Sequence, residues 1–396
     1  MNEFSFAIID KDKKTRARTG VIKTKHGKIE TPYLVPVATR GNIIALSMKD
    51  LAKIKVQALL ANTYHLYLLK GDKIVKKKGG LHGLMKFNKP IFTDSGGFQA
   101  FSLGIGREIN LRKIGFFPNK RTSKEKGERY SKITEKGVLF KSVYDGSEHF
   151  IGPKESMKIQ SNLGADIIMA FDECTSPTHT KKEIKESMER SHRWEVESLK
   201  YRDKKQALYG IIHGGWFKDL RIKSAKFINS LPFDGIAIGG SLGETKESMY
   251  EILDWIMNKI DERPRHMLGI GWIDDIFECV ERGIDTFDCV EMTRVARHGN
   301  LYIGPKSGGK KENKFRLNIS RSIYSKDRKP IDSTCRCSTC KIYSRSELHK
   351  LIKNKDLKYG NLATVHNIIF MENLTKKIRE AIKKGKFKEL KKNWIK

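Results

Sequence analysis

Three aspartates in this sequence come at or near the end of short apolar runs. Asp94 closes Ile-Phe-Thr-Asp, Asp172 closes Met-Ala-Phe-Asp, and Asp288 lies in Thr-Phe-Asp-Cys-Val. If these runs are parallel strands, the carboxylates lie in a partly desolvated rim, where their pKa can be adjusted for acid, base or nucleophile chemistry. A single aspartate of this kind is more often a helix N-cap or a satisfied loop residue. Three at one rim favour catalysis.

Pairs of glycines lie beside or between these aspartates. They occur in Ser95-Gly96-Gly97, in His213-Gly214-Gly215 and in Gly239-Gly240-Ser241. Because glycine has no Cβ, its backbone N–H can approach a flat ligand closely. Simple turn geometry is the alternative explanation for each pair.

A cysteine cluster indicates a metal site of a different kind. Cys335, Cys337 and Cys340 lie within one short segment, and His349 and His366 follow. Three thiolates and one imidazole make a closed tetrahedral zinc site with no open position for a substrate, so we expect a structural role. A reactive cysteine pair is the rival, but three cysteines with a downstream histidine fit zinc better.

The elements that must position these residues follow an alternating pattern. Eight short apolar runs are separated by segments that include convincing helices, which is typical of a parallel sheet with crossover helices. The runs are 33–37, 58–62, 91–94, 167–172, 208–213, 235–239, 266–271 and 286–290, and the clearest helices are 153–163, 181–201, 220–231, 246–260 and 274–282. Eight such units predict an α/β fold, a (β/α)8 TIM barrel, whose active site lies at the carboxyl ends of the strands. An open doubly wound sheet is the alternative, but no Gly-x-Gly-x-x-Gly turn follows the first run.

Three segments fall outside the barrel pattern. Residues 1–32 are expected to form an N-terminal hairpin, because Thr19-Gly20 and His26-Gly27 are turn signals. The barrel itself spans 33–300, with a charged insertion near 104–137. Residues 301–396 are expected to hold a zinc-binding subdomain and a lysine-rich C-terminal helix.

The charge balance favours a polyanionic partner. Lys and Arg number 78 against 46 Asp and Glu, a formal net charge of +32. Such an excess attracts nucleic acid, although a lysine-rich coding bias is an equally simple explanation. No apolar run approaches the roughly 18 residues of a membrane span, and the N-terminus lacks a secretory pattern. We therefore expect a soluble, cytoplasmic protein that does not bind membranes.

The joint occurrence of four motifs resembles a known family. These are Asn62-Thr63-Tyr64-His65-Leu66, Thr93-Asp94-Ser95-Gly96-Gly97-Phe98-Gln99, Phe171-Asp172-Glu173-Cys174 and Arg282-Gly283-Ile284-Asp285-Thr286-Phe287-Asp288-Cys289-Val290. In this order they resemble the tRNA-guanine transglycosylases, or queuine tRNA-ribosyltransferases, over about residues 33–366. The resemblance is to the bacterial type, because no archaeal-type RNA-binding extension follows the cysteine cluster.

The resemblance implies an enzyme that flips out the wobble guanosine of a tRNA anticodon loop and replaces its guanine with a 7-deazaguanine. Asp288 matches the family's nucleophile and Asp94 its general acid/base. Attack by one carboxylate gives a covalent ribosyl ester, and displacement by the incoming base restores the configuration. A second carboxylate that cycles between acid and base serves both half-reactions.

The resemblance also implies a base pocket, tRNA contacts and a metal. The residues that match base-binding positions are Asp172, His213, Gly240, Phe98, Leu268 and Cys174. Asp172 would accept from the base edge, the Gly240 N–H would donate to the carbonyl, and Phe98 with Leu268 would sandwich the ring. Arg294 and Arg297 match positions that contact the anticodon loop. The family spacing favours His366 over His349 as the fourth ligand of one structural Zn²⁺, and family members commonly form homodimers.

Departures from the bacterial pattern leave the incoming base open. His213 stands where bacterial members usually carry a glutamine, the loop 239–244 is one residue shorter, and Glu291-Met292 replaces an apolar-proline pair. Either preQ1 or queuine fits these changes. Two other functions are alternatives. A non-catalytic tRNA-binding subunit is disfavoured by the three retained aspartates, and a barrel metallohydrolase is disfavoured because histidines do not cluster at strand ends.

Overall fold

The computed structural model describes residues 3–101, 131–176 and 178–395. At its centre is an eight-stranded parallel sheet in the order β4-β14-β13-β12-β11-β10-β6-β5. The strands are β4 (Tyr33–Pro36), β5 (Leu59–Ala61), β6 (Ile91–Thr93), β10 (Ile167–Met169), β11 (Ala207–Ile212), β12 (Gly235–Ile238), β13 (Arg265–Met267) and β14 (Thr286–Cys289). Each of the eight predicted runs overlaps one of these strands.

The two edges of this sheet meet. A parallel bridge joins Val37, just after β4, to Leu60 of β5. Because sequential strands are neighbours all the way round, the sheet closes into a barrel. The predicted (β/α)8 barrel is confirmed, and the open doubly wound alternative is wrong.

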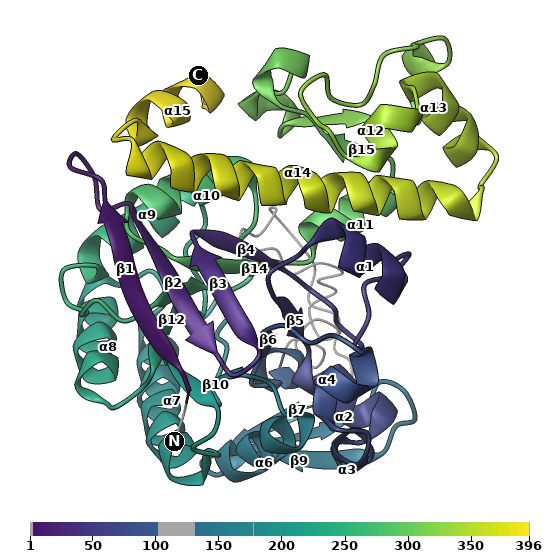
Figure 1. The fold of residues 1–396 in the computed structure, drawn as a ribbon. Coiled ribbons are helices and arrows are strands. Elements are labelled where there is room, and N and C mark those ends of the chain that lie inside the picture. Colours follow the sequence, from purple (N-terminus) through teal and green to yellow (C-terminus); the bar gives the residue numbers. More distant parts are fainter. Residues whose placement is uncertain (1–2, 102–130, 177, 396) are drawn as a thin grey trace.

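Helices cover the outside of the barrel, as Figure 1 shows. They are α1 (Met48–Ile54), α2 (Thr63–Lys70), α3 (Asp72–Lys77), α4 (Gly80–Met85), α6 (Pro153–Leu163), α7 (Lys181–Tyr201), α8 (Lys218–Ser230), α9 (Lys246–Ile256), α10 (Ile273–Glu281) and α11 (Glu291–Arg297). Several begin at capping residues; Thr180, for example, accepts from the Glu183 N–H at the start of α7. The strands are short and the helices begin at capping residues, so the position at which each strand ends is well defined. These strand ends form the rim of the barrel.

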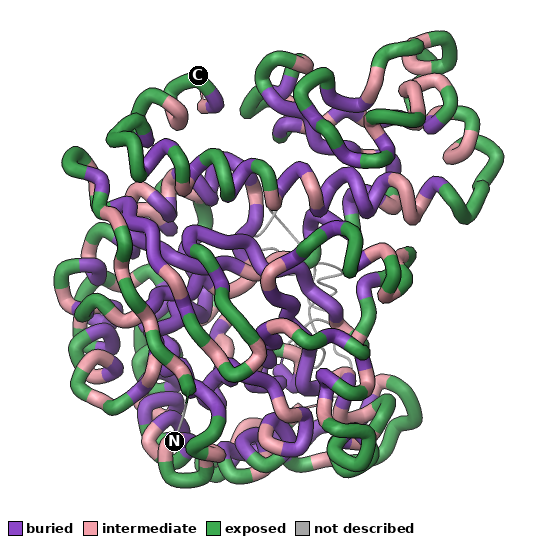
Figure 2. Tube along the Cα trace, viewed as in Figure 1, coloured by how far each residue is buried: buried purple, intermediate pink, exposed green. Residues whose placement is uncertain are grey.

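Strand side chains alternate between two cores. In β11, Tyr209 and Ile211 belong to the core inside the barrel, while Leu208 and Ile212 pack with the helices. This alternation is the period of two that a strand imposes. Figure 2 shows the consequence: buried residues follow the strands, and exposed residues lie on the outer helix faces.

The N-terminal segment forms three antiparallel strands where a hairpin was expected. They are β1 (Ser5–Lys11), β2 (Arg18–Thr24) and β3 (Gly27–Thr31). Ile22 and Ile29 belong to the inner barrel core. Arg18 pairs with Asp285, which precedes β14, at 2.6 Å. The sheet therefore closes the end of the barrel opposite the candidate active site.

The expected insertion at 104–137 lies mostly outside the described residues. Its described end leads into a three-stranded antiparallel sheet of β7 (Ser131–Thr134), β8 (Gly137–Lys141) and β9 (Glu148–Ile151). These strands stand between β6 and α6 in the chain.

The C-terminal part combines a small module with a long helix. The module contains β15 (Asn300–Tyr302), β16 (Arg316–Asn318), α12 (Ser338–Ile342) and α13 (Arg345–Lys353). It is followed by α14 (Leu357–Lys383) and α15 (Phe387–Trp394). In Figure 1, α14 runs beneath the module and across the barrel. It contacts both β4 and α11, so it covers the seam where the barrel closes.

Candidate active site and metal centre

The three aspartates lie at the carboxyl ends of barrel strands. Asp94 directly follows β6, Asp172 lies three residues after the end of β10, and Asp288 is the next-to-last residue of β14. In a barrel the carboxyl ends of all parallel strands meet at one face. The expected gathering of these residues at a common rim is therefore what the topology produces.

Asp288 is held through one of its two carboxylate oxygens. Its Oδ1 accepts from the Gly269 N–H at 3.0 Å and lies 3.2 Å from Nε2 of His266. The other ring nitrogen of His266 is 2.9 Å from the Thr286 hydroxyl, and its ring is completely buried. Among the described residues, no recorded hydrogen bond reaches Oδ2. Of the two oxygens, Oδ1 is thus the one fixed by neighbouring groups in the described part of the chain.

Asp94 is a buried carboxyl with donors on both oxygens. The Thr63 N–H donates to Oδ1 at 2.8 Å, and the Asn62 side-chain amide donates to Oδ2. Burial raises the pKa of Asp94 to about 7; the Thr63 N–H opposes this rise and the charge of Asp288 adds to it. A carboxyl with a pKa near neutrality can both give and take a proton.

Asp172 has a similar environment next to His213. The Ser95 hydroxyl donates to its Oδ1 at 2.9 Å, and His213 Nε2 lies 3.4 Å from its Oδ2. Burial raises the pKa of Asp172 to about 7, against the lowering effect of the Ser95 hydrogen bond. The edge of a base placed here would meet one carboxyl and one imidazole.

A buried arginine ties together the two glycine-rich loops of the rim. Arg221 of α8 donates to the carbonyls of Gly215 (2.6 Å), Ile212 (2.8 Å), Gly239 (3.0 Å) and Ser241 (2.7 Å). Its side chain is fully buried, and burial lowers its pKa to about 9. Four carbonyl dipoles thus replace the water that a guanidinium otherwise needs.

Gly240 lies where one of these loops meets His213. It has φ of +70°, and a Cβ there would sit 3.3 Å from His213 Nδ1. Any side chain would therefore be strained and would crowd the imidazole. The site requires glycine at this position.

The remaining base-pocket candidates, Leu268, Phe98 and Cys174, follow the carboxyl ends of β13, β6 and β10. Leu268 follows β13 and packs against the inner core, close to Gly239. Phe98 lies just after Gly97 and is 38% exposed, as a residue at a rim would be. Cys174 follows Asp172, and burial raises the pKa of its thiol, so it is a neutral thiol rather than a thiolate.

The two candidate tRNA-binding arginines lie on α11, directly after the strand that carries Asp288. Arg294 is half-exposed and pairs with Glu291 at 2.5 Å, and Glu291 also pairs with Arg316 at 3.0 Å. Arg297 donates to the Thr293 carbonyl at 3.1 Å. Both therefore lie near the rim, and Arg294 is oriented by a carboxylate.

The cysteine cluster forms a site that fits a metal ion. The Sγ atoms of Cys335, Cys337 and Cys340 lie 3.8, 3.5 and 3.3 Å from His366 Nδ1. Tetrahedral zinc with bonds of about 2.3 Å to sulfur and about 2.0 Å to nitrogen would separate such ligands by about 3.5 Å. His366 Nε2 lies 2.8 Å from the Tyr302 carbonyl, which fixes its proton there and leaves Nδ1 free for a metal. His349 is directed to the Ile319 carbonyl instead.

A second cluster at the closed end of the barrel does not fit a metal. His26 and His82 both contact Asp166, at 2.7 and 3.2 Å. Their rings are stacked 3.6 Å apart with only 22° between the planes. A metal bound by two imidazoles must lie near both ring planes, and planes stacked in this way do not meet close to the rings. Hydrogen bonding to Asp166 accounts for the cluster.

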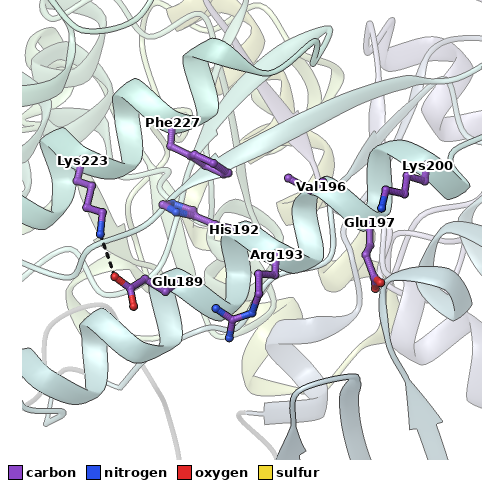
Figure 3. A pocket seen from close by; sticks show the side chains of 8 residues that line it. All are labelled: Glu189, His192, Arg193, Val196, Glu197, Lys200, Lys223 and Phe227. Carbon is purple, nitrogen blue, oxygen red and sulfur yellow. Dashed lines mark hydrogen bonds and ion pairs between the residues drawn. The ribbon is translucent and has the colours of Figure 1, made fainter.

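A surface pocket also lies away from the rim. Figure 3 shows it between α7 and α8, with the stacked pair His192 and Phe227 at its back and the Lys223–Glu189 ion pair at one side. Since it lies on the outer helices, it is separate from the aspartates.

Sequence reasoning missed several residues of the site. Asn62 lies in one of the four motifs, but no role was predicted for it. No role was predicted for His266, Arg221 or Ser95 either. Asn62 meets Asp94 because Ala61 of β5 pairs with Thr93 of β6, so the next residue of each strand is a neighbour. The contact thus follows from a register that only the structure shows.

No helix in the described part of the chain is long and apolar enough to cross a membrane.

Comparison with known proteins identifies the family of this chain. Residues 12–396 match the family model described as queuine tRNA-ribosyltransferase. A relative from Archaeoglobus fulgidus is 47% identical over 96% of both chains. The queuine tRNA-ribosyltransferases of Roseiflexus sp. and Fusobacterium nucleatum are 42% and 43% identical, over 99% of this chain and 99% and 97% of theirs. The chain is therefore a member of the queuine tRNA-ribosyltransferase family of enzymes.

Proposed function

We propose that this protein exchanges the wobble guanine of target tRNAs for a 7-deazaguanine base, by double displacement through a covalent ribosyl ester of Asp288. The observation that carries the proposal is the asymmetric environment of Asp288. Its Oδ1 is held by Gly269 and His266, which leaves Oδ2 as the attacking oxygen.

Proton transfer is assigned to Asp94. In the first half-reaction the protonated carboxyl gives its proton to the departing guanine as Asp288 forms the bond to the ribose carbon. In the second, the carboxylate takes a proton from the incoming base, which displaces Asp288 and restores the original configuration. A pKa near 7 supports both steps.

Base recognition is assigned to the buried groups beside these two carboxyls. An ionised Asp172 accepts from the N–H groups of the base edge, while the Gly240 N–H and His213 face its carbonyl. Phe98 and Leu268 cover the faces of the flipped ring, and Cys174 lines the pocket. Arg294 and Arg297 contact the anticodon loop, where their guanidinium groups suit phosphates and splayed base edges.

The metal, the assembly and the compartment complete the proposal. We assign one structural Zn²⁺ to Cys335, Cys337, Cys340 and His366, a donor set that zinc favours. When bound, the ion cross-links the module to α14. We further propose a homodimer, and a cytosolic location with its tRNA substrate.

The test is base exchange itself. Incubation with tRNA and labelled guanine should transfer label into the anticodon, and unlabelled preQ1 or queuine should then compete. The base that competes at the lowest concentration is the physiological one. A protein that binds tRNA but transfers no label under conditions where a known family member does would overturn the proposed function.

A further inference from the structure

A further buried carboxyl, from Glu195, lies next to His213 of the candidate base pocket. Glu195 of α7 is completely buried, and its Oε2 accepts from the Ile211 N–H at 3.1 Å. The last register pair between β10 and β11 is Met169–Tyr209, so the Ile211 N–H lies beyond the reach of β10. Glu195 thus supplies one partner that the strand ladder cannot.

The other oxygen of Glu195 faces His213. Glu195 Oε1 lies 3.8 Å from His213 Nε2, and both atoms are buried without a hydrogen-bond partner in the described structure. On its other side, the same Nε2 lies 3.4 Å from Asp172 Oδ2. The imidazole nitrogen is therefore placed between two carboxyl groups, and its partner depends on which group carries a proton.

Burial shifts the pKa values of both Glu195 and His213. It raises the pKa of Glu195 well above its ordinary value and lowers the pKa of His213 well below its own. The nearby charges of Arg221 and His192 lower that of His213 further. Both shifts favour the uncharged forms, a carboxylic acid at Glu195 and a neutral imidazole at His213. Because Oε2 accepts from Ile211, the acid proton belongs on Oε1.

We propose that Glu195 donates a hydrogen bond from Oε1 to His213 Nε2 and so fixes His213 in the tautomer that carries its proton on Nδ1. This inference rests on the proposed role of His213 in base binding. Nδ1 faces Gly240, whose N–H is assigned to the base carbonyl. The fixed tautomer therefore presents a second donor to that carbonyl and leaves Asp172 Oδ2 free to accept from the base.

The opposite tautomer, with the proton on Nε2, would weaken base binding at Asp172 and at the base carbonyl. With the proton on Nε2, His213 would donate to Asp172 and compete with the N–H groups of the base. Its Nδ1 lone pair would then face the carbonyl oxygen and repel it. Glu195 is thus a positioning residue that acts through His213.

The tautomer can be measured in the wild-type protein. With ring-¹⁵N histidine in the full-length chain, the two ring nitrogens of His213 have distinct shifts, and His213→Gln identifies the signals by their loss. We expect protonation on Nδ1 near neutral pH. Protonation on Nε2 overturns the inference whether or not the protein exchanges bases, so this result is independent of the proposed function.

Substitutions test the consequence for binding. Glu195→Leu should raise KM for guanine about tenfold, as expected for one misdirected hydrogen bond. Glu195→Gln, which can still donate from its amide, should stay within about threefold of wild type. Glu189→Leu, on the exposed face of the same helix, is the matched control and should leave KM unchanged.

A double-mutant cycle separates this role from a structural one. With Gln at position 213 there is no tautomer to fix, so Glu195→Leu in the His213→Gln background should change KM by less than about twofold. An equal effect in both backgrounds, or equal KM values for Glu195→Leu and wild type, contradicts the proposal. If Glu195→Leu does not fold, the wild-type tautomer and Glu195→Gln still decide it.

Discussion

At the scale of single residues, the site depends on carboxyl groups that burial makes weaker acids. Asp94 and Asp172 both have a pKa raised to about 7. In the proposed reaction their required states are opposite, since Asp94 must be protonated to release guanine and Asp172 must be ionised to accept from the base. Burial thus favours the protonated form of Asp94, which can act as an acid. It also favours the protonated form of Asp172, which is a poorer hydrogen-bond acceptor.

These opposite requirements predict a bell-shaped dependence of kcat/KM on pH. The rate should fall as pH rises through about 7, because Asp94 loses its proton, and also as pH falls through about 7, because Asp172 gains one. The measurement is initial-rate exchange of labelled guanine at constant ionic strength. A rate that stays level from about pH 5 to about pH 9 would contradict the assignment of these two groups.

At the scale of elements, Arg221 connects α8 to the loops after β11 and β12. Its four carbonyl partners lie in or beside the glycine-rich segments that form the rim. The same helix also supplies Ser224, whose hydroxyl accepts from the His213 N–H at 3.0 Å. The conformation of both loops thus depends on side chains from α8.

Replacing this side chain should damage both stability and binding. Arg221→Met leaves buried carbonyls without donors, and we expect a loss of about 3–5 kcal/mol in the free energy of unfolding together with a higher KM for guanine. Urea unfolding and exchange kinetics measure the two effects. Lys223→Met, at an exposed position on the same helix, should cost less than about 1 kcal/mol. Similar losses for the two variants would refute the role of Arg221.

Helix α11 offers a test of the tRNA contact. Arg294→Ala should weaken tRNA binding and lower the slope of log affinity against log salt by about one, because one phosphate contact is lost. Lys226→Ala on the outer face of α8 removes the same charge at an exposed site away from the rim. If both variants change the salt slope equally, the net charge of the protein, rather than Arg294, explains the attraction to tRNA.

The periodicity of the sequence predicts helices but not the contacts between elements. The predicted helices 153–163 and 181–201 match α6 and α7, because caps and apolar spacing mark their ends. The Asn62–Asp94 and His266–Asp288 contacts depend on strand register. The approach of Glu195 to His213 depends on how α7 packs against β11. Neither register nor helix rotation is encoded in a local pattern, so these partners could not be predicted.

At the scale of the whole molecule, α14 links the metal centre to the barrel. It carries His366 and extends to the barrel seam, where Glu372 accepts from the Tyr33 hydroxyl at 2.5 Å and Arg379 donates to the Pro32 carbonyl at 2.9 Å. The sequence predicted a zinc-binding subdomain and a C-terminal helix within residues 301–396. The structure shows that one helix belongs to both.

Metal removal should therefore weaken more than the module. We expect about one zinc per chain by elemental analysis, and a lower Tm after chelation or in His366→Ala. His349→Ala is the matched control and should retain the metal, since that imidazole contacts the Ile319 carbonyl. Folded wild-type protein without zinc, or full zinc content in His366→Ala, would contradict the ligand set.

The central claim is that Asp288 forms a covalent bond with the ribose of tRNA. The most direct measurement is mass spectrometry of peptides from protein trapped with tRNA and denatured before the second displacement. We expect a base-free ribose-phosphate adduct on the peptide that contains Asp288, and its absence, with loss of exchange, in Asp288→Asn. An adduct on another residue, or wild-type exchange by Asp288→Asn, would contradict it.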